Sequence, residues 1–412
     1  MTAGIPTWNL NAVQVLALGC LGVLMGRWLK KRLPALDRLC IPTSIVGGMI
    51  FALAALLFRD RLVNFEMDST LRDLMMIAFM STIGLNARWN LLRRGGTQVL
   101  WMLVLASCGA VLQNLLGMGL AKLLHINPLM GILSGSVALA GGPATAVAFG
   151  STFEAMGVRG ATELGLASAT FGIAVSGLVG GYIGSQLIRR YRLQPQQNSI
   201  ELTEKQAAQS DGLQSDGRAS GREQKFDAAS LLSTILTIGL AMGIGSLISL
   251  SLTKLGFILP SYIGAMIAAA ALRNFNDRFP FLTISESALH SCAQVSLYLF
   301  IVMAVLALKL WELAHLAIPL IVILIAQVAL CWLMCVVASF RTMGRDYESA
   351  VMAAGFCGFM LGITANAVAC MEELVEKYGP AQRAFLVVPV VGAFLIDFTN
   401  ALIITTMANL IR

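Results

Sequence analysis

The chain has 412 residues, of which 57% are hydrophobic and only 12% are charged, and its mean hydropathy is +0.77. A single water-soluble core cannot bury so much apolar surface, so the composition excludes an ordinary soluble domain. The formal net charge of +7 does not indicate a nucleic-acid partner, because the Lys and Arg residues gather in short segments between apolar runs. These runs are continuous and lack the alternation of a membrane β-barrel, so we expect an all-α polytopic membrane protein.

Ten apolar segments are predicted to be membrane-spanning helices, five in each half of the chain. In chain order they are 9–28, 41–58, 71–87, 97–124, 161–188, 230–253, 258–272, 286–308, 314–338 and 383–409. Each half also has a shorter apolar segment interrupted by glycines, at 128–150 and at 347–371. We interpret these two as hairpins that enter the membrane and return to the same side. Interpreted as complete spans instead, they would give twelve helices.

The two interrupted segments carry similar motifs. Residues 140–148 read A-G-G-P-A-T-A-V-A, and residues 361–369 read L-G-I-T-A-N-A-V-A. Matched breaks in the two halves of a polytopic chain are typical of a transporter built from inverted repeats, with the binding site at the breaks. We therefore expect a first repeat at 1–188 and a second, upside-down repeat at 229–412, with hairpin tips that meet near the middle of the membrane.

The segment between the repeats, 189–228, is rich in Gln, Ser, Gly and Asp, which predicts a linker without a core of its own. Most of the Lys and Arg residues fall on one side of the membrane if both termini lie outside and the linker lies inside. This orientation agrees with the excess of positive charge found in cytoplasmic loops.

Asp397 stands in the middle of the last apolar segment, in F-L-I-D-F-T-N-A-L, three residues before Asn400. An ionised carboxylate at the bilayer centre costs about 2.5–3.5 kcal/mol, so Asp397 is expected to face a cavity and hold a cation. Asn400 lies on the same helical face and is expected to add a further oxygen ligand. Sodium or an ammonium group is one candidate partner of this pair; the alternative is that Asp397 and Asn400 only pack helices together.

The interrupted segments supply the other candidate ligands: Thr145, Thr364 and Asn366, flanked by Gly141, Gly142 and Gly362. Hydroxyl and amide oxygens suit sodium, so both threonines are also expected sodium ligands, and free N–H groups at a helix start suit a carboxylate. Neither segment contains Lys or Arg, which favours a small carboxylate over a polyphosphate as substrate. The alternative is that the small residues only allow close helix packing.

Other polar and sulfur-containing residues indicate no catalytic site. The eight cysteines lie mostly within apolar spans without C-x-x-C spacing, so we interpret them as small buried residues and not as metal or redox sites. The three histidines form no cluster with carboxylates or thiols, and no nucleophile–base set is evident, so no enzyme is expected. Gln113, Asn114, Gln294 and Gln327 are expected to form hydrogen bonds between helices.

Six strings in fixed order carry a resemblance to a known family: L-R-D-L-M-M-I-A-F-M-S-T-I-G-L-N-A (71–87), N-P-L-M-G-I-L-S-G-S (127–136), A-T-F-G-I (169–173), L-K-L-W-E-L-A (308–314), A-A-G-F-C-G-F (353–359) and F-L-V-V-P-V-V-G-A-F-L-I-D-F-T-N-A-L-I (385–403). The chain resembles the bacterial sodium/glutamate symporters along almost its whole length. The resemblance implies ten spans, two opposed re-entrant hairpins and a homodimer in the bacterial inner membrane, with periplasmic termini and a cytoplasmic linker. It also implies sodium-driven uptake of glutamate by an elevator mechanism.

This chain departs from the family in both hairpins. The family typically reads Ser-Gly-Gly-His-Gly-Thr-Gly where residues 140–146 read Ala-Gly-Gly-Pro-Ala-Thr-Ala. Phe356 stands where a histidine is usual, and Ala365-Asn366 where Pro-Thr is usual. Asp397 and Asn400 match. We therefore expect a sodium-coupled symporter of glutamate or a related small carboxylate or amino acid; the alternative is a proton- or sodium-coupled carrier of a different organic or amino acid, and a channel is less favoured.

Overall fold

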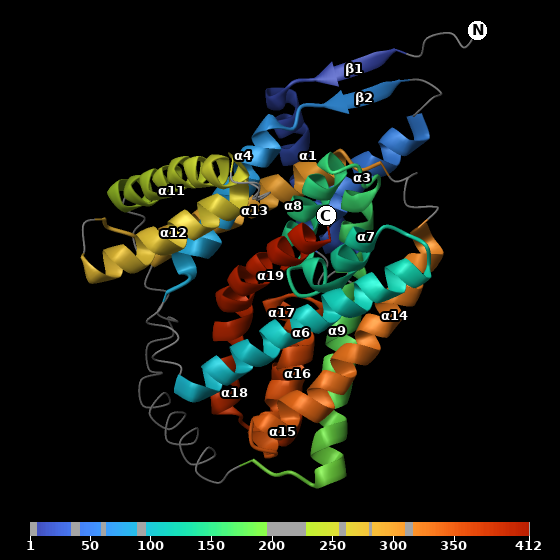
Figure 1. Cartoon of the computed structure of the whole chain (residues 1–412), viewed down its shortest axis with the longest axis vertical. Helices are drawn as coiled ribbons and strands as arrows, with labels where there is room; N and C mark the ends of the chain where they lie inside the picture. The colour runs from blue at the N-terminus through green and yellow to red at the C-terminus, as the bar shows by residue number, and fades with distance from the viewer. Residues whose placement is uncertain are drawn as a thin grey trace.

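The computed structural model describes residues 6–33, 42–58, 63–88, 96–195, 228–254, 261–279, 282–309 and 316–411 (Figure 1). Most of the expected linker, residues 196–227, lies outside the described part of the chain. Nearly every described element is a helix, which confirms the all-α class. The exception is a parallel pair of short strands, β1 (Thr7–Leu10) and β2 (Asn64–Met67), joined across their faces by Trp8 and Phe65, whose ring centroids lie 6.3 Å apart.

The helices follow the order that hydropathy predicted. The first half contains α1 (Ala12–Arg32), α3 (Thr43–Phe58), α4 (Thr70–Asn86), α6 (Gly96–Leu123), α7 (Pro128–Ile132), the π-helix η1 (Leu133–Val137), α8 (Gly142–Ala155) and α9 (Ala161–Tyr191). The second half contains α11 (Ala228–Lys254), α12 (Ser261–Arg278), α13 (Glu286–Leu306), α14 (Ala317–Leu333), the π-helix η4 (Met334–Ser339), α15 (Phe340–Thr342), α16 (Tyr347–Leu361), α17 (Thr364–Tyr378), α18 (Gln382–Val390), the π-helix η5 (Val391–Leu395) and α19 (Ile396–Leu410). Each expected span therefore contains a helix, and each expected hairpin contains a break.

Six of the described helical segments are long and apolar enough to cross a membrane: α1, α6, α9, the 229–252 part of α11, α13, and α14 continued through α15. The bent pair formed by α18 and α19 makes a seventh if it counts as one span. In the described part of the chain, α3 and α4 are shorter, with 16 and 17 residues, and α12 carries charged side chains in its last turns. Helix length and composition thus establish a polytopic membrane protein and do not by themselves establish ten spans.

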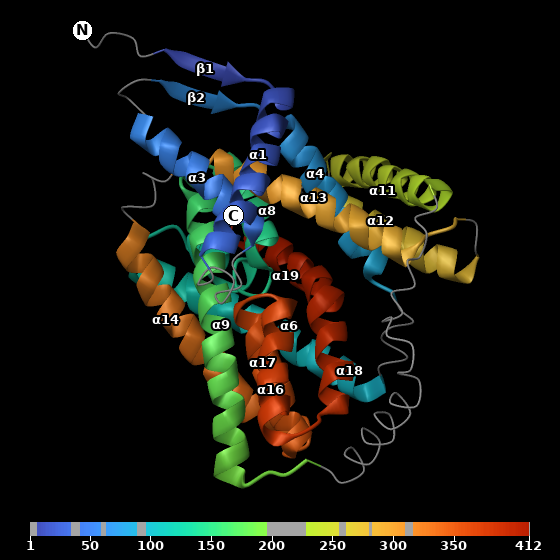
Figure 2. The same ribbon diagram turned by 180° about the vertical axis from the view of Figure 1, so that it is seen from behind.

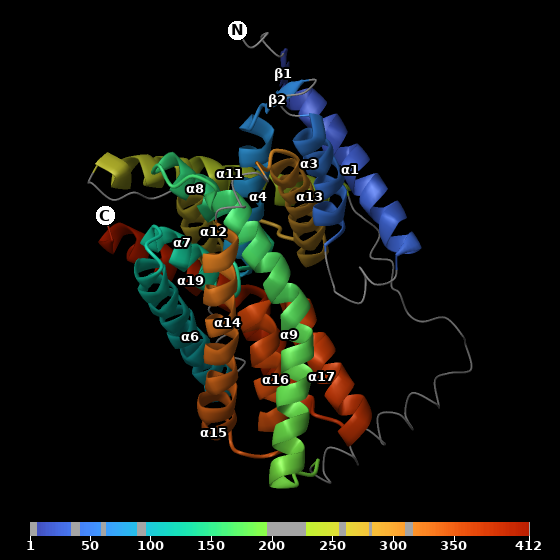
Figure 3. The ribbon, with the colours of Figure 1, turned by 90° about the vertical axis from the view of Figure 1, so that its right-hand side faces the viewer.

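The helices form two groups that each draw on both halves of the chain (Figures 1 and 2). The companion group consists of α1, α3 and α4 with α11, α12 and α13, which pack against one another. The hairpin group consists of α6 to α9 with α14 to α19. In the hairpin group, α9 runs alongside α16 and α17 (Figure 3). The groups meet where α8 contacts α13 and where α19 contacts α12.

Glycines allow the first hairpin to approach α6 closely. A Cβ atom on Gly117 of α6 would lie 2.1 Å from the backbone oxygen of Gly131 on α7, and a Cβ on Gly131 would lie 2.2 Å from that of Gly117. No real Cβ contact is so short, so the two backbones can cross here only because both residues lack a side chain. This crossing holds the incoming arm of the hairpin against α6.

We expect Gly117→Ala to destabilise the protein by about 1–3 kcal/mol, because the added methyl group forces the two backbones apart. Gly119→Ala is the matched control: it lies on the same helix, nothing is within 4 Å of its Cβ position, and alanine favours helix by about 0.5–1 kcal/mol over glycine. Thermal unfolding in detergent should show a lower melting temperature for Gly117→Ala and an unchanged or higher one for Gly119→Ala. Equal melting temperatures would contradict the close crossing.

Candidate functional site

The first hairpin breaks at glycines. Asn127 caps the start of α7, and its side chain accepts a hydrogen bond from the Leu129 N–H at 2.9 Å. Helical geometry fails at Gly135, where φ is −96° and ψ is −128°, and the chain turns before α8 begins at Gly142. Gly142 has a φ of +69°, in the left-handed region that favours glycine. No side chain caps the start of α8.

The second hairpin breaks between α16 and α17. Gly362 follows α16 with φ −144° and ψ −125°, and the extended residue Ile363 precedes α17. No side chain caps the start of α17 either. Thr364 donates a hydrogen bond from its hydroxyl to the Gly392 carbonyl oxygen at 2.6 Å, which ties this break to η5. Each hairpin therefore presents a helix start whose first N–H groups have no side-chain cap.

The two breaks lie against each other beside α9. A Cβ on Gly142 would lie 3.2 Å from Cγ2 of Ile363, so the two tips are in van der Waals contact. A Cβ on Gly172 of α9 would lie 2.1 Å from the backbone oxygen of Leu361 and 2.8 Å from Cδ2 of Leu139. Gly172 thus allows one helix of the first half to contact both tips.

Asn366 links the second hairpin to α9. Its side-chain amide donates to the Ile173 carbonyl oxygen at 2.7 Å and to the Ser176 hydroxyl at 3.0 Å. The side chain is buried, and its Oδ1 has no hydrogen-bond partner in the described structure. One half of the amide is therefore used for packing, and the carbonyl oxygen remains available to a ligand.

Asn400 makes the corresponding link between α19 and the first hairpin. Its amide donates to the Ser136 carbonyl oxygen at 2.9 Å, and the Ser136 N–H donates to Oδ1 of Asn114 at 3.0 Å. The Asn400 Oδ1 and the Ser136 hydroxyl are buried without partners among the described residues. The last long helix of each half is thus bonded to the hairpin of the other half.

The unpaired buried atoms of Asn366, Asn400 and Ser136 are all oxygens, and each is a possible ligand atom for a cation. Buried polar atoms normally have a hydrogen-bond partner, so unpaired amide and hydroxyl oxygens in two hairpins whose tips touch indicate a ligand. Hard cations prefer carbonyl, amide and hydroxyl oxygens to nitrogen or sulfur. The residues present at the tips therefore fit a sodium ion.

The remaining predicted residues have less defined roles. Thr145 is buried on α8, with its methyl group against Gly141. Gly362 lies against α9, where its Cβ position is 2.5 Å from the Ser176 hydroxyl. Asp397 is partly exposed on α19, one turn before Asn400, and makes no ion pair within the described chain. An unpaired carboxylate at this position keeps Asp397 a candidate cation ligand.

Ser136 and Ser176 were not predicted as site residues. The cluster Ser134-Gly135-Ser136 within an apolar run is the signal that could have indicated Ser136. Among the polar residues predicted to bond helices together, Gln113 donates to the Met360 carbonyl oxygen at 3.0 Å and Gln327 donates to the Gln113 carbonyl oxygen at 2.7 Å, which confirms that prediction.

The same prediction was wrong for Gln294. Its side chain is exposed, so it bonds to His290 on the same helix, at 2.9 Å, and not to another helix of the described chain.

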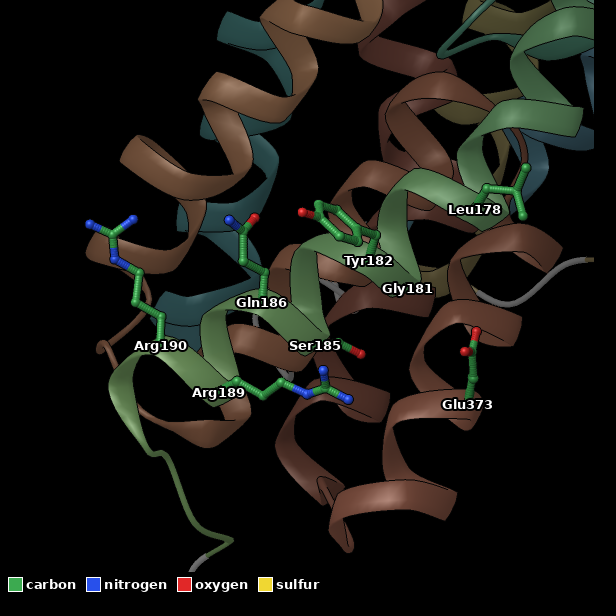
Figure 4. A pocket seen from close by; sticks show the side chains of 8 residues that line it. All are labelled: Leu178, Gly181, Tyr182, Ser185, Gln186, Arg189, Arg190 and Glu373. Atoms are coloured by element: carbon green, nitrogen blue, oxygen red, sulfur yellow. The ribbon is translucent and has the colours of Figure 1, made fainter.

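A surface recess lies away from the hairpin tips, between α9 and α17 (Figure 4). It has a volume of about 670 Å³ and is lined by Leu178, Gly181, Tyr182, Ser185, Gln186, Arg189, Arg190 and Glu373. Arg189 is already engaged, since its Nε donates to the Tyr378 hydroxyl at 3.1 Å. Leu178 and Tyr182 are 75% and 64% exposed, so this groove opens outward and does not connect the two hairpins.

The chain is similar to known proteins along almost its whole length. Residues 8–380 match the family model described as sodium/glutamate symporter. The sodium/glutamate symporter of Escherichia coli is 37% identical over 96% of this chain and 97% of its own length, and that of Haemophilus influenzae is 34% identical over 96% of each chain. Among solved structures, the sodium proton antiporter of Methanocaldococcus jannaschii covers 97% of this chain and 98% of its own at 16% identity, and its TM-score of 0.45 is too low to support an argument. On the family match and these identities, the chain belongs to the sodium/glutamate symporter family.

Proposed function

We propose that this protein is a secondary active transporter that carries glutamate into the cell together with sodium. The observation that carries the proposal is the meeting of two broken hairpins, one from each half, with buried acceptor oxygens of Asn366, Asn400 and Ser136 left unpaired. The family match supports both substrates, because the relatives are named sodium/glutamate symporters.

We propose that backbone groups hold the carboxylates of glutamate. Neither hairpin contains a Lys or Arg residue between positions 128 and 155 or between 347 and 371. The starts of α8 and α17 present N–H groups without side-chain caps, and the partial positive charge of a helix start favours an anion there. Gly141, Gly142 and Gly362 allow a ligand to approach this backbone. Sodium is expected to take oxygens from Asp397, Asn400, Thr145 and Thr364.

We further propose an elevator mechanism in which the hairpin group moves relative to the companion group. Each group takes matching helices from both halves, as expected of two inverted repeats. The hydrogen bonds between the groups include Thr152 to Tyr262 at 3.2 Å and the Lys309 N–H to Glu163 at 2.6 Å, both of which can be exchanged during movement. In this proposal ten spans cross the bacterial inner membrane, the termini are periplasmic, the linker is cytoplasmic, and the companion groups of two protomers form a homodimer.

Reconstitution into liposomes distinguishes this proposal from its rivals. With an inward sodium gradient, labelled glutamate should accumulate above its outside concentration, and the accumulation should collapse when sodium is equal on both sides. A channel would only equilibrate glutamate, and an enzyme would change it. Accumulation driven by a proton gradient alone, or of another organic acid but not glutamate, would support the alternative carrier.

Asp397→Asn tests the role of the carboxylate in sodium coupling. The amide keeps the shape of the side chain and removes its charge, so the sodium concentration for half-maximal uptake should rise by about tenfold or more, equivalent to at least ~1.4 kcal/mol. Sodium titration of glutamate uptake, with protein amount and melting temperature matched to the wild type, measures this shift. A wild-type sodium requirement would assign Asp397 a packing role only.

Asn400→Ala tests the unpaired oxygen at the first tip. Loss of a ligand, together with an unpaired Ser136 carbonyl, should cost about 1–3 kcal/mol, so sodium affinity should fall by roughly ten- to hundredfold. Asn409→Ala is the matched control, because Asn409 lies near the end of the same helix and its amide donates to the Thr405 carbonyl oxygen one turn away. Sodium-dependent thermal shifts of both variants measure the difference. If both variants keep wild-type affinity, the tips do not hold the ion.

A further inference from the structure

Three buried cysteines from separate segments lie together in the hairpin group. Cys331 is on α14, Cys335 on η4 and Cys357 on α16, and their Sγ atoms all lie within 4.8 Å of one another. Each residue is at most 2% exposed, and all three are free thiols. The three cysteines are buried, as predicted, and helix packing unites residues that the sequence separates.

The local structure explains how the thiols converge. Cys331 and Cys335 are one helical turn apart and share a face, and the helix widens into a π-helix at Met334, between them. Cys357 comes from α16, which packs against both α14 and η4. Two segments of the hairpin group, α14 with η4 and α16, thus contribute to one cluster, and neither segment contains all three cysteines.

Two methionines extend this sulfur-rich junction. Met334 and Met360 lie three residues after Cys331 and Cys357, one turn further along the same helices. Their Cε atoms lie 3.0 Å and 2.9 Å from the position that a Cβ on Gly109 of α6 would occupy, so both thioether side chains end at the same place. Thioethers and thiols are soft ligands, in contrast to the oxygen set at the hairpin tips.

We propose that Cys331, Cys335 and Cys357 bind one soft cation, with Cu(I) as the physiological ion. Metal–sulfur bonds of about 2.3 Å place the sulfurs of a trigonal site about 4 Å apart, and the three Sγ atoms already lie within 4.8 Å of one another. Thiol sulfur selects Cu(I) over sodium, so this site is distinct from the transport site.

The number of sulfur atoms also favours Cu(I). Cysteine coordinates a metal through its deprotonated sulfur, so each thiol that coordinates Cu(I) releases its proton, and no oxidation state changes. Structural zinc sites take four ligands, whereas the cluster in the described part of the chain offers three sulfurs, which suits a three-coordinate soft ion. Because metal would join α14 and η4 to α16, we expect it to stabilise the incoming arm of the second hairpin.

The test uses the full chain with the cysteines outside the cluster replaced by alanine: Cys20, Cys40, Cys108, Cys292 and Cys370. The reduced protein in nanodiscs is loaded with Cu(I) without oxygen and competed against the chelator bathocuproine disulfonate. We expect one copper per chain, a sulfur-only coordination shell in X-ray absorption, and a raised melting temperature, since a ligand that binds only the folded state stabilises it.

Removal of single cluster thiols distinguishes the site from adventitious binding. Cys357→Ala and Cys331→Ala, each in the same background, should retain less than about one tenth of the copper under the same chelator. Melting curves without copper establish whether each variant is folded. If one variant does not fold, the copper content of the other still tests the site. The proposal is overturned if the background protein holds no copper, if a folded single variant retains it fully, or if the bound copper has nitrogen or oxygen ligands.

Discussion

The structure depends on one constraint: backbone polar groups freed by a break in a membrane helix must find partners inside the protein. The chain breaks near Gly135 and at Gly362. The amide side chains of Asn114 and Asn400 bond to the backbone of Ser136 beside the first break, and Asn366 joins the second hairpin to the Ile173 carbonyl oxygen of α9. Each of these amides comes from a different helix. The breaks therefore exist only because the surrounding helices are already in place.

The same constraint explains why the proposed sodium site takes residues from both halves of the chain. An asparagine side chain that donates its amide N–H groups to the protein still has a carbonyl oxygen. Burial keeps water from forming a hydrogen bond with this oxygen. The stabilising residues and the candidate ligands are thus the same residues. Glycines at the crossings of α6 with α7 and of α9 with both tips bring these side chains within reach. A rigid packing arrangement and the proposed cation site arise together.

Hydropathy was sufficient to predict the order of the helices and the position of both breaks, because long apolar runs and matched glycines are local features of the sequence. The strand pair β1–β2 was not predicted, since strands of four residues carry little periodicity. Ser136 and the cluster of Cys331, Cys335 and Cys357 were not predicted either, because their partners are distant in sequence and only helix packing brings them together. Asn366 and Asn400 were predicted, since an amide within an apolar run is itself conspicuous.

The central claim is that the meeting point of the two hairpins holds both substrates. Determination of the structure in nanodiscs by cryo-electron microscopy, with sodium and glutamate present, tests it most directly. The account predicts glutamate density between residues 135–145 and 361–366, and an ion within bonding distance of the Asn366 or Asn400 carbonyl oxygen. Glutamate density in the outward groove at Arg189 and Arg190, with the hairpin tips still in contact and no ion beside them, would contradict it.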